Sequence, residues 1–145
     1  VGTGPLEARV RAHPRVRALG WLPAAAVRAR MRRARYLLVP SLWYENFPRT
    51  IVEAYACSLP VLASDIGALR EIVPDGRTGR RVAPGDAAAW AAAIQWAESH
   101  GTELSGMGDS ARATYESAYS PALNHAQLLS IYAAAMAERP CGGSR

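Results

Sequence analysis

The chain has 145 residues, of which 50% are hydrophobic and 20% are charged. This length supports one globular domain with its own core and is too short for two. The composition excludes a membrane span, because no apolar run reaches roughly 18 residues, and the first residues lack the apolar stretch of a secretion signal. Two well-separated cysteines, Cys57 and Cys141, indicate neither a disulfide framework nor a clustered metal site. We therefore expect a reduced, cytoplasmic setting.

The positive charge is concentrated at the front of the chain. All 17 basic residues are arginine, and before Glu45 the only acid is Glu7. Such a stripe is typical either of solvated helix surfaces or of a site for an anionic partner. One alternative to an enzyme is therefore an arginine-rich module that binds nucleic acid or an anionic surface, and a steep salt dependence of DNA binding would reveal it.

Short apolar runs alternate with longer helical stretches, which is the pattern of an α/β domain. The run at 36–40 is apolar on both faces, as in a covered parallel sheet. In chain order, the sequence predicts a helix over 6–12, a strand over 16–19, a helix over 23–34, a strand over 36–40, a loop over 41–48, a helix over 49–58, a strand over 59–64, a helix over 69–73, a strand over 79–83, and helices over 87–100, 103–118 and 121–138.

Several residues predict how the helices begin and pack. Asp86 and Thr102 are expected N-caps, and Pro23 is expected in a first helical turn. Residues at helical spacing predict core-facing stripes in two of the last helices, namely Trp90, Ile94 and Ala97 in one and Leu128, Ile131 and Ala135 in the other. Residues 139–145 are predicted to be a flexible tail.

The stretch from 41 to 61 is the most informative, because Glu45 in the loop precedes Glu53 in the helix by eight positions. Open parallel sheets bind ligands outside the carboxyl ends of their strands, where this loop lies. A helix beginning near Pro48 would point free backbone N–H groups at that crevice, which suits a diphosphate. The groups expected to be free are those of Arg49, Thr50 and Ile51.

Glu53 stands in a nearly apolar helix, and burying an unpartnered carboxylate is costly. One interpretation is that it accepts hydrogen bonds from the vicinal hydroxyls of a ligand. The other is an i,i+4 ion pair with Arg49, worth about 0.3–0.5 kcal/mol on a solvated face. The aromatic residues Trp21, Trp43 and Tyr44 likewise either stack on a base or sugar or pack in the core.

The ordered motifs from Pro40 to Asp86 resemble the donor-binding half of retaining glycosyltransferases of the family 4 type. They are a P-S dipeptide, E-x7-E, a P-V strand, G-x-x-E-I-V, D-G-x-x-G and a P-x-D helix start. The resemblance implies a Rossmann-like parallel sheet with flanking helices, the C-terminal half of a GT-B fold. Residues 1–138 would form this nucleotide-sugar-binding domain. The family commonly has glycine where this chain has Ser58.

The resemblance also implies roles for individual residues. Glu45 would contact donor-sugar hydroxyls near the reacting carbon as the catalytic glutamate, and Glu53 would bind the ribose hydroxyls. Leu22 would lie near the nucleobase, while Glu71 would be structural. The sugar-diphosphate cradle would be the backbone of Asn46, Phe47, Pro48, Arg49, Thr50 and Ile51.

By the same resemblance, an arginine and a lysine that grip the diphosphate, two strands of the sheet and the acceptor-binding domain would precede Val1. The sequence also lacks an initiating methionine, so we expect a piece of a longer protein that does not turn over by itself, with a gap or rearranged pairing between 16–19 and 36–39. The whole enzyme would transfer a hexose from a nucleotide-diphosphate sugar to an acceptor hydroxyl, with retention.

The expected partners are a nucleotide-sugar donor and, through the acceptor-binding domain, a sugar or lipid-linked glycan, with no nucleic acid. Peripheral association with the inner face of the membrane is compatible with this expectation. No cofactor or metal is expected, because no D-x-D motif is present and the histidines are isolated. A sugar-nucleotide epimerase of the same architecture is a further alternative, although no base for its reaction can be identified.

Overall fold

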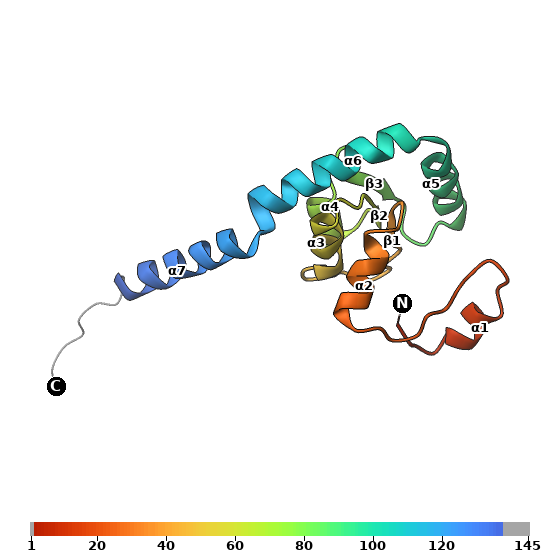
Figure 1. The fold of residues 1–145 in the computed structure, drawn as a ribbon, viewed down its shortest axis with the longest axis horizontal. Helices are drawn as coiled ribbons and strands as arrows, with labels where there is room; N and C mark the ends of the chain where they lie inside the picture. Colours follow the sequence, from red (N-terminus) through yellow and green to blue (C-terminus); the bar gives the residue numbers. More distant parts are fainter. Residues whose placement is uncertain (1, 138–145) are drawn as a thin grey trace.

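The computed structural model describes residues 2–137, and these form a three-stranded parallel sheet with helices on both of its faces (Figure 1). The strand order is β1-β2-β3, with Leu37 opposite Val61 and Val61 opposite Gly79. The strands are β1 (Leu37–Val39), β2 (Val61–Ser64) and β3 (Gly79–Val82). The helices are α1 (Glu7–Arg11), α2 (Ala24–Met31), α3 (Arg49–Ala56), α4 (Gly67–Ile72), α5 (Ala87–Ser99), α6 (Gly101–Thr114), a π-helical segment η1 (Tyr115–Tyr119) and α7 (Pro121–Ala137).

The central strand β2 divides the core into two clusters. Val61 and Ala63 pack with α2, α3, α4 and α6, whereas Leu62 faces the opposite side with α5 and part of α6. Side chains alternate between the two faces of a strand, so a strand covered on both faces must be apolar throughout. All four residues of β2 are buried, which confirms the predicted parallel α/β arrangement.

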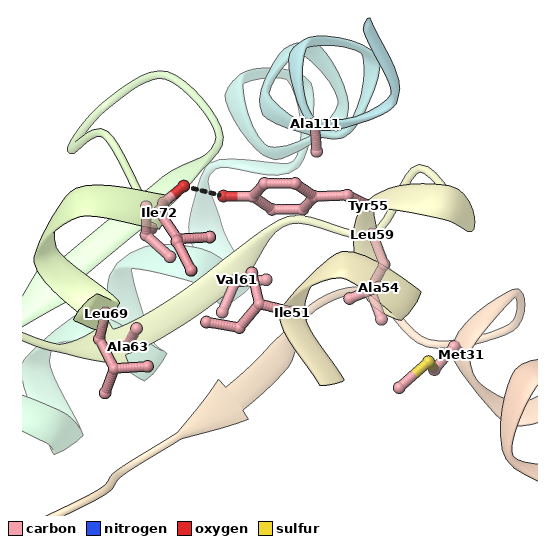
Figure 2. Packing of buried hydrophobic residues seen from close by; sticks show 11 residues of the cluster. Met31, Ile51, Ala54, Tyr55, Leu59, Val61, Ala63, Leu69, Ile72 and Ala111 are labelled. Atoms are coloured by element: carbon pink, nitrogen blue, oxygen red, sulfur yellow. Dashed lines mark hydrogen bonds between the residues drawn. The ribbon is translucent and has the colours of Figure 1, made fainter. Parts of the chain in front are cut away.

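A buried polar contact stabilises the larger cluster. The Tyr55 hydroxyl donates to the Ile72 carbonyl oxygen at 2.9 Å (Figure 2). The same hydroxyl lies 2.5 Å from Thr78 Oγ1. Burial raises the pKa of Tyr55 to about 12, which favours the protonated hydroxyl that donates this bond to Ile72. This bond holds the end of α4 against α3, the helix that carries Glu53.

The predicted helix starts and core stripes are partly confirmed. Asp86 caps α5 by accepting from the N–H groups of Ala88 and Ala89 at 2.9 and 3.0 Å, and Trp90, Ile94 and Ala97 pack in the smaller cluster. Two expected helix starts are wrong by position: α6 begins at Gly101 with no side-chain cap from Thr102, and Pro23 precedes the first residue of α2.

The predicted strand at 16–19 is wrong. This segment has no strand pairing, and the following Gly20 carbonyl accepts a hydrogen bond from the Gly2 N–H at 2.7 Å. A strand forms only where its N–H and C=O groups meet a neighbouring strand. Figure 1 shows α1 and its flanking loops extending away from the sheet, so this segment meets no such neighbour.

The predicted core stripe of the last helix is also wrong. Leu128 and Ile131 are 44% and 63% exposed, because α7 extends away from the rest of the molecule (Figure 1). The three residues of this stripe are therefore exposed among residues 2–137. The predicted tail at 139–145 and the end of this helix at 138 lie outside the described residues.

Ser58, where glycine is common in the resembling family, has a positive φ of 55°. This conformation costs a non-glycine residue about 1–2 kcal/mol. We therefore expect Ser58→Gly to raise the free energy of unfolding by about 0.5–1 kcal/mol in urea titrations, after allowing for the greater chain entropy of glycine. Ser105→Gly on the exposed face of α6 is the matched control and should lower it by about 0.5–1 kcal/mol. A destabilised Ser58→Gly variant would contradict this prediction.

Candidate functional site

The loop after β1 lies across the carboxyl ends of the other two strands. The Tyr44 ring packs directly on Gly67, the first residue after the β2 turn, where a Cβ atom would lie 2.7 Å from Tyr44 Cδ1. Leu42 lies beside Gly85 in the turn after β3, where a Cβ would lie 3.6 Å from Leu42 Cδ2. The loop is therefore at the edge of the sheet where open parallel sheets bind ligands.

Glu45 is exposed in this loop. Its Oε1 accepts a hydrogen bond from Ser41 Oγ at 3.2 Å, and Ser41 Oγ also lies 3.2 Å from the Trp43 carbonyl oxygen. Glu45 makes no ion pair with any residue in 2–137. The carboxylate is thus oriented by a neutral hydroxyl and keeps its negative charge available to a ligand at this edge.

The backbone at the start of α3 differs from the prediction. The Arg49 N–H donates to the Phe47 carbonyl oxygen at 3.0 Å, and the Ile51 N–H donates to the Pro48 carbonyl oxygen at 2.9 Å. These two groups, predicted to be free, are bonded within a tight turn, because chain carbonyls come within reach before the regular helical pattern begins. Of the three groups predicted to be free, the Thr50 N–H is the one that has no acceptor among residues 2–137.

One face of α3 borders a cavity of about 320 Å³. The opposite face, with Ile51, Ala54 and Tyr55, is buried in the core. Residues at i, i+3, i+4 and i+7 share a helix face, and in α3 the cavity-lining residues with this spacing are Arg49, Val52, Glu53 and Ala56. Glu53 is half-buried there, and the ion pair with Arg49 that sequence allowed is not formed.

The cavity brings together residues from four parts of the chain. Of the predicted site it contains Phe47, Arg49 and Glu53. Leu22 is half-buried before α2 and does not line it, while Pro48 and Ile51 are buried and Asn46 is exposed. Trp21, Trp43 and Tyr44 are 75%, 80% and 83% exposed, so the alternative of core packing for these three is wrong.

The residues that line the side of this cavity opposite α3 were not predicted from the sequence. Arg28 of α2 and two tyrosines of η1, Tyr115 and Tyr119, line it together with Pro121. The phenyl ring of Phe47 lies 6.2 Å from the Tyr119 ring, at an interplanar angle of 59°. The sequence shows two tyrosines just before the helix start at Ser120-Pro121. It does not indicate which element these tyrosines face.

Two further features of residues 2–137 concern metal ions and membranes. No group of three or more histidine, cysteine, aspartate or glutamate side chains could hold a metal ion there. Metal-free chemistry stays a prediction. None of the described helices is long and apolar enough to cross a bilayer.

Residues 1–99 match the family model of glycosyl transferases group 1. The chain belongs to this family. Among curated relatives of this group 1 chain is a phosphatidyl-myo-inositol mannosyltransferase of Mycobacterium leprae, 40% identical over 79 residues, which are 54% of this chain and 21% of the relative. The resemblance to glycosyltransferases expected from the motifs is thereby confirmed at the level of group 1.

Solved structures confirm the expected fold of the group 1 chain. Sucrose-phosphate synthase from Thermosynechococcus elongatus matches with a TM-score of 0.86 and 27% identity, covering 95% of this chain and 38% of that protein. HepE of Anabaena in complex with UDP-glucose matches with a TM-score of 0.79 and 24% identity, over 88% of this chain and 34% of that one. The chain thus spans a minor part of each of these proteins.

Proposed function

We propose that this chain is the donor-binding part of a glycosyltransferase that moves a hexose from a nucleotide-diphosphate sugar to an acceptor hydroxyl, with retention. The single observation that carries the proposal is Glu53, a half-buried carboxylate that lines a cavity next to the start of α3 without an ion-pair partner in residues 2–137. A carboxylate that faces a cavity with no ion-pair partner can accept hydrogen bonds from a ligand, and the vicinal hydroxyls of a ribose supply two donors.

The positive charges around the cavity suit the diphosphate of such a donor. Arg28 and Arg49 line it, and neither pairs with an acid within the described residues. Together with the free Thr50 N–H at the start of α3, they supply positive potential for a diphosphate. The HepE fold accommodates UDP-glucose, which supports a nucleotide sugar as the donor class for a chain of this fold.

In the proposed reaction, the acceptor oxygen bonds to the anomeric carbon while the bond from that carbon to the diphosphate oxygen breaks on the same face. The acceptor proton passes to the departing diphosphate. Glu45 would hold the donor-sugar hydroxyls near the reacting carbon. Cations and backbone amides near the start of α3 would stabilise the charge that develops on the diphosphate.

The partners beyond the donor follow from the same proposal. The acceptor, a sugar or lipid-linked glycan, would be bound by an acceptor-binding domain outside this chain. Exposed arginines on α2 and its C-terminal turn, Arg28, Arg30, Arg32 and Arg33, would favour peripheral contact with the anionic inner face of a cytoplasmic membrane. The family match favours neither of the alternatives considered, the nucleic-acid module and the epimerase.

Calorimetric titration of the chain with UDP, GDP, UDP-glucose and GDP-mannose tests the donor class. We expect one nucleotide series to bind, and no binding by any of them would contradict the proposal. Retention is tested in a protein that joins this chain to an acceptor-binding domain, by NMR of the anomeric configuration of the first product. An inverted product would contradict the proposed same-face displacement.

In such a two-domain protein, we expect Glu45→Ala to lower kcat by about 100-fold, because this exposed carboxylate would act on the sugar as charge develops. The donor Kd should change by less than about 3-fold, since cavity contacts at α3 remain. Initial rates and calorimetry measure the two values, with Glu71→Gln on α4 as the control. Equal losses in kcat and affinity would show that Glu45 serves binding alone.

A further inference from the structure

The π-helical segment η1 places two tyrosines beside the donor loop. Tyr115 and Tyr119 are both half-buried, and both pack against the larger core cluster. They also line the cavity that contains Glu53 and Phe47. Each tyrosine is therefore in contact with the rigid core and with the proposed donor site.

Tyr119 contacts the loop itself. Its ring and that of Phe47 lie at a centroid distance of 6.2 Å and an angle of 59°, a tilted arrangement that aromatic pairs favour. Phe47 is 52% exposed, so little else covers it. Because Phe47 directly precedes Pro48 at the start of α3, the position of its ring is tied to the backbone there.

The loop is held at two places. At its front, Tyr44 packs on Gly67, and near its end Phe47 packs on Tyr119. Between these contacts stand Glu45 and Asn46, both exposed. The contact between Phe47 and Tyr119 therefore limits how far the backbone from Glu45 to Arg49 can move.

The π turn determines that Tyr119 is the residue that faces the loop. A π turn includes about one residue more than an α turn, and each helical residue turns the side-chain direction by about 100°. An uninterrupted α-helix from Gly101 through Tyr119 would thus aim a different face at Phe47. Such π segments are frequent at functional sites.

We infer that Tyr119 is a positioning residue for the donor loop: its ring holds Phe47, and through Phe47 the backbone that would bind the donor diphosphate. This inference rests on the proposed function. It assigns to η1 a part in donor binding that the E-x7-E motif does not reveal.

The test uses Tyr119→Leu, Phe47→Leu and the double variant, with UDP and GDP as probes in calorimetry and with amide hydrogen exchange of residues 41–50 in the absence of nucleotide. We expect Tyr119→Leu to weaken nucleotide binding about five-fold and to speed exchange in the loop about five-fold. The double variant should be no weaker than Phe47→Leu alone, because the two changes remove one contact.

Two further variants serve as controls for the loss of the Tyr119 ring. Tyr119→Phe retains the ring and should restore exchange and affinity to within about two-fold of the original chain. Tyr132→Leu removes an exposed tyrosine of α7 and should change neither. Circular dichroism shows which variants remain folded, and Tyr119→Phe reports on positioning even if Tyr119→Leu unfolds, because a weakened Tyr119→Phe would contradict a role for the ring alone.

The outcomes separate this inference from the proposed function. If the original chain binds nucleotide and Tyr119→Leu changes neither affinity nor exchange, the positioning role is overturned and the donor proposal stands. Additive losses in the double variant also overturn it. If neither nucleotide binds while loop exchange still responds to Tyr119, the donor proposal fails, and the donor role of Tyr119 fails with it.

Discussion

Glu53→Gln should weaken the binding of UDP or GDP by about ten-fold or more. Hydrogen bonds to a charged group contribute about 1.5–3 kcal/mol, and each 1.4 kcal/mol is about a factor of ten in affinity. The effect is expected because Glu53 lines the cavity at α3 with no cation within ion-pair distance in residues 2–137. Calorimetry with the folded variant measures the loss.

Deoxynucleotides make this prediction specific to the ribose. The original chain should bind UDP more tightly than 2′-deoxy-UDP, and Glu53→Gln should lose most of that preference, because the carboxylate accepts from the hydroxyl that is missing. Glu71→Gln changes the same charge on an exposed helix position and serves as the control. A Glu53→Gln variant with unchanged affinity and unchanged ribose preference would show that the assignment is incorrect.

Gly79→Ala should lower the free energy of unfolding by about 3 kcal/mol or more. A Cβ at this position would lie 1.8 Å from the Val61 carbonyl oxygen, and also within 2.8 Å of the Val61 N and C atoms. Those atoms belong to the central strand, which pairs on both sides and cannot shift without breaking hydrogen bonds. Urea or thermal unfolding measures the loss.

Gly106→Ala on α6 is the matched control for this change. A Cβ there would meet no atom within 4 Å, so alanine should instead raise stability by about 0.5–1 kcal/mol through its higher helix propensity. If Gly79→Ala were as stable as the original chain, the close approach of β2 and β3 in the structure would be incorrect.

The sequence predicted the elements that local pattern defines. Four consecutive buried residues in β2, the carboxylate cap of α5 by Asp86 and the start of α7 at Pro121 each depend on neighbouring residues in the chain. The ordered motifs around Glu45 and Glu53 were sufficient to predict the family. For the strand and the helix starts the information lies within a few residues, where periodicity and capping act. The family signal is instead spread over the ordered motifs from Pro40 to Asp86.

Two predictions from the sequence were wrong where a segment with an apolar pattern had no neighbouring element to complete it. Segment 16–19 and the stripe on α7 have the residues of a strand and of a buried helix face, but among the described residues the first has no neighbouring strand and the second stays exposed. Burial requires a second surface as well as an apolar residue. Such positions cannot be predicted from periodicity, because periodicity describes only one of the two surfaces.

By itself, the sequence determined the order of strands and helices from α2 onward, the glutamate pair and the family. Only the tertiary structure decided that two of the three N–H groups expected at the start of α3 are already bonded, that Glu53 has no ion pair with Arg49, and that the tyrosines of η1 line the cavity. The physical reason for the first two is that a hydrogen bond or ion pair between neighbouring residues depends on the exact backbone turn and side-chain orientation, which residue types alone do not set. The cavity wall depends on distances between segments remote in the chain. Spacing in the sequence fixes which side chains share one helix face but not which element that face meets.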